Sequence, residues 1–129
     1  MGLDNGIILK EEHEKVKDYF LWSTEIQEDK ETEICYWRKC WNIRDVILRV
    51  LHVEGENEDS YPIEVDDIKP IIKGIIKLMS KEAWSNYPGS IWDFDEMAET
   101  LVLNLCNLKL LQKYMQDHPD AQVYFYDSY

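Results

Sequence analysis

The residues best suited to ligand chemistry lie in one aromatic and basic stretch, YWRKCWN, from Tyr36 to Asn42. In a helix, Arg38 and Asn42 would lie one turn apart and could reach the same ligand. A guanidinium group beside aromatic rings suits a carboxylate or a phosphate, because its planar donors bind two oxygens at once. Asp4 and Ser128 could complete a polar pocket if the two ends of the chain lie across this helix.

These residues define one hypothesis, a domain that binds a small ligand such as a nucleotide or an acidic metabolite. Its candidate ligand-binding residues are Asp4, Tyr36, Arg38, Asn42 and Ser128. A purely structural role is the alternative, in which Arg38 pairs with Asp4 or Asp93 and Asn42 bonds to the backbone.

Motifs for catalysis and for metal binding are missing from the sequence. Asp93 and Asp95 could act as paired carboxylates, but Asp93 and Glu96 already have the spacing of a helix cap. Neither Cys35 nor Cys40 has a neighbouring histidine, and the sequence has no GxSxG motif and no phosphate-binding loop. The three histidines are scattered along the chain. We therefore expect a protein that is not an enzyme and that has no cofactor and no metal site.

The acidic charge of the chain favours a second hypothesis, an interaction protein. The formal net charge is −12, and a surface of that sign repels phosphate backbones and attracts basic partners. Direct binding of nucleic acid is therefore not expected. The expected partner is instead a basic surface of a host nucleic-acid-binding protein. The run from Glu54 to Asp67 holds seven acids and no base. Its candidate partner-binding residues are Glu54, Glu56, Glu58 and Asp59, which would stand in for phosphates; the alternative is an ordinary solvated surface.

Cysteine usage and hydropathy bear on the compartment. The chain has three cysteines, an odd number in apolar surroundings, which fits a reducing compartment. No apolar run is long enough to cross a membrane, and the polar N-terminus does not resemble a secretory signal. We expect a cytoplasmic protein with no membrane contact, and the sequence sets no oligomeric state.

Helical periodicity predicts three main helices. The first covers residues 34–53 and buries Trp37 and Trp41. The second begins at Asp66 or Asp67, and its Gly74 would let another helix approach closely. The third begins near residue 93 and ends at His118-Pro119. A second apolar line along this last helix predicts that it is sandwiched between other elements; the line consists of Leu103, Cys106 and Leu110.

Residues rich in β-formers predict strands at both ends of the chain. They cover residues 3–9 and the segment around Val123 and Phe125, and residues 18–25 could add a third strand. A chain of 129 residues with this apolar content forms one domain. We therefore predict a single α+β domain, residues 1–129, in which about three main helices pack on a small, mostly antiparallel sheet formed by the N- and C-terminal strands.

Three short motifs occur in a characteristic order. The chain opens with MGLDNG, carries YWRKCWNI from Tyr36 to Ile43, and closes with FYDSY, while WDFDEM precedes the last expected helix. This order resembles a family of small bacteriophage and bacterial proteins with no established activity, whose members begin with MGLD, carry a YWRK helix segment and end in an aromatic tail with a serine. The resemblance spans nearly the whole chain and implies a phage or mobile-element setting, but no mechanism.

The chain also departs from the pattern of that family. Many members have Ala and Asn after YWRK and a histidine near the place of Arg44, where this chain has Cys40, Trp41 and Arg44. A catalytic role that needs a histidine at this place is therefore in doubt.

Overall fold

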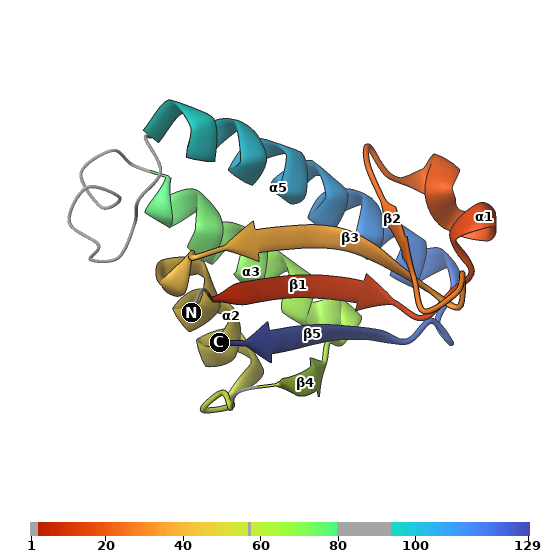
Figure 1. Ribbon diagram of the computed structural model, residues 1–129, viewed down its shortest axis with the longest axis horizontal. Coiled ribbons are helices and arrows are strands. Elements are labelled where there is room, and N and C mark those ends of the chain that lie inside the picture. The colour runs from red at the N-terminus through yellow and green to blue at the C-terminus, as the bar shows by residue number, and fades with distance from the viewer. Residues whose placement is uncertain (1–2, 57, 80–93) are drawn as a thin grey trace.

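A five-stranded antiparallel sheet forms the front layer of the molecule (Figure 1). The computed structural model describes residues 3–56, 58–79 and 94–129. The strands follow the order β2-β3-β1-β5-β4 across the sheet. Their bounds are β1 Asp4–Leu9, β2 Thr24–Ile26, β3 Glu31–Arg38, β4 Asp59–Pro62 and β5 Val123–Ser128.

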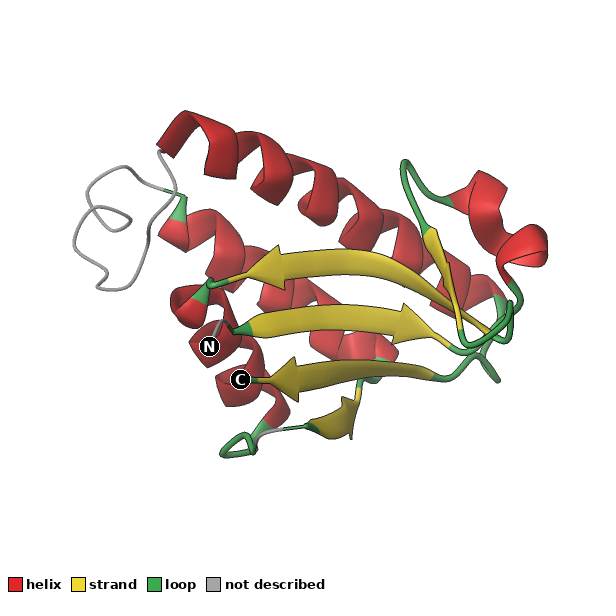
Figure 2. Ribbon diagram, viewed as in Figure 1, coloured by secondary structure: helices red, strands yellow, loops and turns green. Residues whose placement is uncertain are grey.

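Among the described residues, the main helices all lie on one face of this sheet, and the opposite face is called the open face below (Figure 2). The three main helices are α2 Trp41–Leu51, α3 Val65–Leu78 and α5 Phe94–Asp117. The short helix α1, His13–Val16, and a 3₁₀ turn, η1 Lys17–Tyr19, lie beside β2. The predicted α+β fold with a mostly antiparallel sheet is therefore confirmed. No helix in the described part of the chain is both long and apolar enough to cross a membrane.

The two ends of the chain pair with each other at the centre of the sheet, as predicted. Ile7 lies opposite Phe125 in the antiparallel register of β1 and β5, and both side chains are fully buried. On its other edge β1 pairs with β3, with a bulge between Ile7 and Ile8. Strands far apart in sequence thus form one platform against which the helices bury their apolar faces.

The prediction of one helix over residues 34–53 is wrong in its first half. Residues up to Arg38 belong to β3, and α2 begins only at Trp41. Lys39, at a positive φ of 57°, turns the chain from the sheet into the helix layer. Because β3 is rich in β-branched and aromatic residues, its short apolar run fits a covered strand as well as a helix.

Two further expectations about the helices are corrected. Residues 18–25 are mostly not a strand, since β2 begins only at Thr24. The apolar line of Leu103, Cys106 and Leu110 on α5 is exposed, so the described residues do not sandwich this helix. The helix ends at Asp117, as the following His-Pro pair predicts. The expected cap Asp93 lies outside the described residues.

Gly74 of α3 allows the close helix approach that the sequence predicts. A Cβ atom at this position would collide with the side chain of Val46 on α2. The two helices therefore pack through a glycine contact at this point.

Two asparagines of α5 close the edge of β3 beyond the end of β2. Asn104 donates a hydrogen bond to the Tyr36 carbonyl at 2.9 Å, and Asn107 donates one to the Ile34 carbonyl at 2.6 Å. Both asparagines are fully buried. Because buried strand carbonyls need a donor, these side chains take over the role of a missing neighbouring strand.

Candidate functional site

The open face of the sheet gathers four of the five predicted ligand residues. Arg38 and Ser128 both lie opposite Asp4 in the registers of β3 and β5 with β1. The Tyr36 hydroxyl donates a 2.6 Å hydrogen bond to Asp4. Sequence reasoning therefore found one corner of a shared surface, although it placed Tyr36 and Arg38 on a helix.

Asn42 does not belong to this surface. It lies in the first turn of α2, its side chain is only 2% exposed, and its carbonyl oxygen accepts the Ile43 amide at 2.9 Å. The helical spacing of Arg38 and Asn42 does not apply, because Arg38 ends a strand before the chain enters the helix layer. The predicted pocket is thus incomplete.

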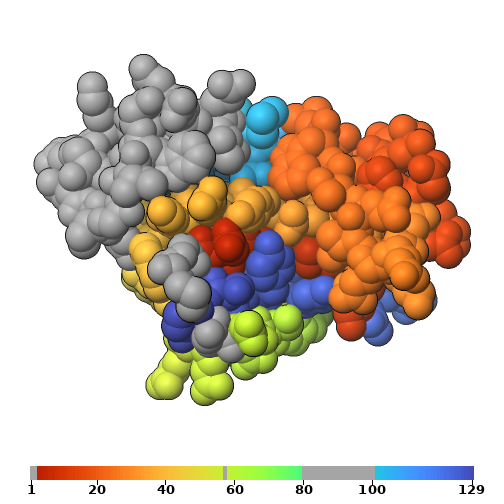
Figure 3. Space-filling view, viewed as in Figure 1, coloured from red at the N-terminus to blue at the C-terminus, as the bar shows by residue number. Residues whose placement is uncertain are grey.

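Three tyrosine–carboxylate pairs dominate the open face, and the sequence did not reveal them. Besides Tyr36 and Asp4, Tyr126 donates to Glu33 at 2.9 Å and Tyr124 donates to Glu31 at 3.0 Å. The last two pairs reach from β5 over β1 to β3, and Figure 3 looks onto this face. The alternation of tyrosines in β5 and of glutamates in β3 was the available signal, but only the strand order brings them together.

Gly6 of β1 makes the central pair possible. A Cβ atom there would lie 2.5 Å from a ring carbon of Tyr126 and 2.7 Å from a carboxylate oxygen of Glu33. A side chain would therefore displace this pair from the middle of the sheet.

A hollow of about 370 Å³ opens beside Glu33, where β2 begins and α5 passes. Trp22 and Tyr36 supply aromatic walls, and Glu33 supplies a carboxylate. None of the described lining residues is basic; they are Trp22, Thr24, Glu33, Tyr36, Leu103 and Asn104. The arrangement combines aromatic rings with a negative charge, which together attract a cationic group.

The electrostatics of the open face set the protonation of these groups. Burial, together with repulsion from Asp4, raises the pKa of Glu33, while the hydrogen bond from Tyr126 opposes the shift. Burial and the bond to Asp4 raise the pKa of Tyr36 to about 12. Burial likewise raises the pKa values of Tyr124 and Tyr126. At neutral pH the tyrosines therefore remain protonated and act as donors to the carboxylates.

The raised pKa of Glu33 predicts a pH-dependent effect on stability. A carboxyl group whose pKa rises on folding stabilises the fold at low pH, and this contribution is lost as pH rises through the folded-state pKa. At pH 7, we expect Glu33→Gln to raise the free energy of unfolding. The gain should be less than about 1 kcal/mol, because the group is partly solvated. Relative to the parent protein, the gain should shrink as the pH falls through the folded-state pKa of Glu33 and should vanish below the unfolded-state value of about 4.3.

Urea unfolding at pH 7, 5 and 3.5 measures this difference, with the exposed Glu56→Gln as a control that should show none. A loss of stability in Glu33→Gln that is equal at all three pH values would contradict the expected sign.

A second hollow, of about 630 Å³, lies at the other end of the sheet near Glu31 and Tyr124. Lys10 also lines it, and its ammonium group lies 5.4 Å from the centre of the Tyr124 ring. The protein thus already places its own cation on this tyrosine. The hollow beside Glu33 has no such internal cation in the part of its lining that the structure describes.

The predicted acidic loop lies at the β4 edge of the sheet. Its four candidate residues are all exposed; they are Glu54, Glu56, Glu58 and Asp59. Tyr61 fixes the loop through its hydroxyl, which accepts the Glu56 amide at 2.8 Å. The loop therefore presents solvated charge, without the aromatic groups of the hollow.

A buried ion pair anchors the C-terminal strand under this surface. Asp127 is fully buried and accepts hydrogen bonds from Arg44 at 2.8 Å and from Asn5 at 2.9 Å. The Arg44 guanidinium lies 5.4 and 5.0 Å from the centres of the Trp41 and Tyr129 rings, which contact each other. The network joins α2 to both terminal strands.

Comparison with models of protein families, with curated proteins and with solved structures found no match to this chain. The fold and the surface define an acidic α+β protein with an open sheet face carrying tyrosines and carboxylates.

Proposed function

We propose that this protein is a non-enzymatic interaction protein that binds a basic protein surface with the open face of its sheet. The hollow beside Glu33 takes a cationic side chain of the partner. The single observation that carries the proposal is the placement of the Glu33 carboxylate in a hollow that, among the described residues, is lined by two aromatic rings and by no basic side chain.

An arginine of the partner fits this hollow better than a lysine. A guanidinium group is planar and weakly hydrated, so it stacks on aromatic rings while it donates to a carboxylate. Burial disfavours the ionised form of Glu33, and an entering cation would offset that cost. The Arg44 guanidinium beside the rings of Trp41 and Tyr129 is an internal example of the same contact.

The net charge of −12 supports this proposal by its effect on association. A protein of this charge attracts basic partners over several ångströms and accelerates their encounter. The exposed acids from Glu54 to Asp59 contribute to this steering, but fully solvated charges add little to the affinity of the bound complex. The hollow therefore supplies most of the affinity.

The setting that goes with this function is also a proposal. The resemblance described above favours a phage or mobile element, with a host nucleic-acid-binding protein as partner. Cys35 and Cys106 are free thiols, which fits the reducing cytoplasm. The alternative of a small-ligand pocket around Arg38 is weaker, because Asn42 is buried in the helix layer.

Calorimetry with model peptides tests the proposal. The full chain is titrated at about 150 mM salt with an Arg-Gly-rich peptide, with its Lys-Gly counterpart and with a neutral Ser-Gly peptide. We expect the arginine peptide to bind most tightly and the neutral one not to bind. Glu33→Gln should weaken binding about tenfold, or about 1.4 kcal/mol.

The matched control is Glu56→Gln, which removes the same charge from the exposed loop. It should weaken binding less than about twofold, as expected for a solvated charge. Equal losses in the two variants would show that only net charge matters, and the proposed role of the hollow would fail.

A further inference from the structure

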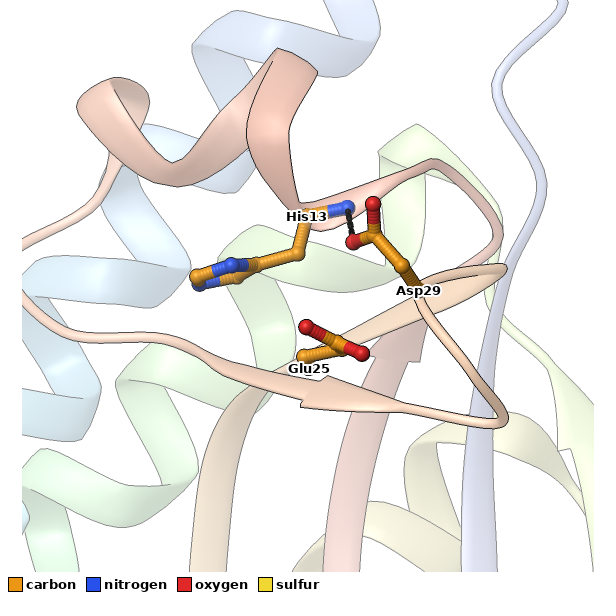
Figure 4. A group of neighbouring side chains, drawn as sticks. All are labelled: His13, Glu25 and Asp29. Atoms are coloured by element: carbon orange, nitrogen blue, oxygen red, sulfur yellow. Dashed lines mark hydrogen bonds between the residues drawn. The ribbon is translucent and has the colours of Figure 1, made fainter.

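A histidine and two carboxylates converge at the edge of the molecule, apart from the hollow. A ring nitrogen of His13 and one oxygen each of Glu25 and Asp29 all lie within 4.8 Å of one another. Among the described residues this is the group with the ligand types and spacing that could hold a metal ion. Figure 4 shows that the three side chains come from the start of α1, from β2 and from the turn between β2 and β3.

Each member of the group is held in place by the fold. The Asp29 carboxylate accepts a 2.7 Å hydrogen bond from the His13 backbone amide. The Nε2 atom of His13 lies 3.0 Å from the Ser23 hydroxyl. The backbone of Glu25 is fixed by its register opposite Thr32, where β2 pairs with β3, while its side chain is exposed. The positions of the three residues thus follow from the hairpin and the helix start together.

We propose that His13, Glu25 and Asp29 bind a divalent transition-metal ion, for which Zn²⁺ is the probe. One imidazole nitrogen and two carboxylate oxygens are ligands that Zn²⁺ accepts, whereas Mg²⁺ and Ca²⁺ prefer oxygen alone. A hydrogen-bond partner on one ring nitrogen is typical of a metal-binding histidine, because it fixes the ring and the tautomer.

The distances between the ligand atoms suit this role after a small movement. Donor atoms about 2.1 Å from a zinc ion lie roughly 3.4 Å apart in a tetrahedral site. The exposed Glu25 can close the remaining gap by rotating its side chain.

Two carboxylates this close repel each other in a protein that is already strongly acidic. Asp29 has a structural role at the His13 amide, but Glu25 has no such bond to the group. A bound cation offsets the repulsion and ties the β2–β3 turn to α1.

Titration of the full chain with Zn²⁺ after treatment with a chelator tests the proposal by calorimetry. We expect one ion per chain, and a loss of affinity of at least about tenfold in His13→Ala. Glu25→Gln, which keeps the size of the side chain, should show a similar loss. This second variant keeps the test valid if His13→Ala does not fold. Circular dichroism checks that both variants are folded.

Matched controls address the other groups that bind zinc. His52→Ala and Cys106→Ser each remove a ligand outside the cluster and should bind Zn²⁺ as the parent protein does. With Mn²⁺ as a paramagnetic probe, amide NMR signals should broaden around residues 13, 25 and 29. No heat of binding, unchanged affinity in His13→Ala, or broadening centred elsewhere would overturn the site.

Discussion

Replacing Asp127 by alanine should lower the free energy of unfolding by about 3–5 kcal/mol, because the change leaves Arg44 as a buried charge without its partner. The Asp127 carboxylate is fully buried, and the Arg44 side chain is only 12% exposed. The variant also removes one of the two acceptors of the Asn5 side-chain amide, the other being the Tyr126 carbonyl. Urea unfolding followed by circular dichroism measures the loss, which should appear as a lower midpoint with an unchanged slope.

Two comparisons make this prediction specific. Asp59→Ala removes an exposed acid that lies directly opposite Asp127 on β4, and it should change stability by less than about 0.5 kcal/mol. The double variant Arg44→Met with Asp127→Leu removes both charges and should regain part of the loss. A loss below about 1 kcal/mol in Asp127→Ala would mean that the ion pair does not anchor the C-terminal strand.

Replacing Asn107 by leucine should be almost as damaging, with an expected loss of about 3 kcal/mol or more. The asparagine side chain donates to the carbonyls of Ile34 and Trp22, at 2.6 and 3.0 Å, and accepts the Leu21 amide at 2.9 Å. Leucine has a similar volume but leaves these three backbone groups without a partner, and each buried unpaired group costs about 1–3 kcal/mol.

Asn104→Leu is the matched control for this prediction. Asn104 is equally buried on the same helix, and its side chain donates one hydrogen bond, to the Tyr36 carbonyl. We expect a smaller loss, of about 1–2 kcal/mol. Hydrogen exchange adds a local readout, because the Leu21 amide should lose protection in Asn107→Leu alone. An equal or larger cost in Asn104→Leu would contradict the proposed role of Asn107.

Local patterns predicted the elements whose periodicity is unambiguous. The β-rich tail around Phe125 and the apolar strand around Ile7 were placed correctly, and His118-Pro119 correctly predicted the end of α5 at Asp117. The helix over residues 34–53 failed because Trp37 and Trp41 are four residues apart, a spacing that fits one helix face. In the fold, Trp37 is buried in a strand, and the chain turns at Lys39 before the helix starts.

The candidate site was predicted only in part, because it depends on pairing between distant segments. Tyr126 meets Glu33 across 93 residues of sequence, and Asn104 meets Tyr36 across 68. No local spacing encodes these contacts, which require the order of β3, β1 and β5 and the course of α5 along the sheet edge. The exposed acids from Glu54 to Asp59 were found correctly, since charge without apolar neighbours predicts exposure.

NMR mapping with the Arg-Gly-rich peptide tests the central claim, that the hollow beside Glu33 receives a cation from a basic partner. When the peptide is added to the ¹⁵N-labelled full chain, we expect the largest shifts at the Trp22 indole and at the amides of Thr24, Glu33 and Tyr36. These shifts should be lost in Glu33→Gln and kept in Glu56→Gln. Shifts confined to residues 54–59, or no shifts with a peptide of this charge, would contradict the account.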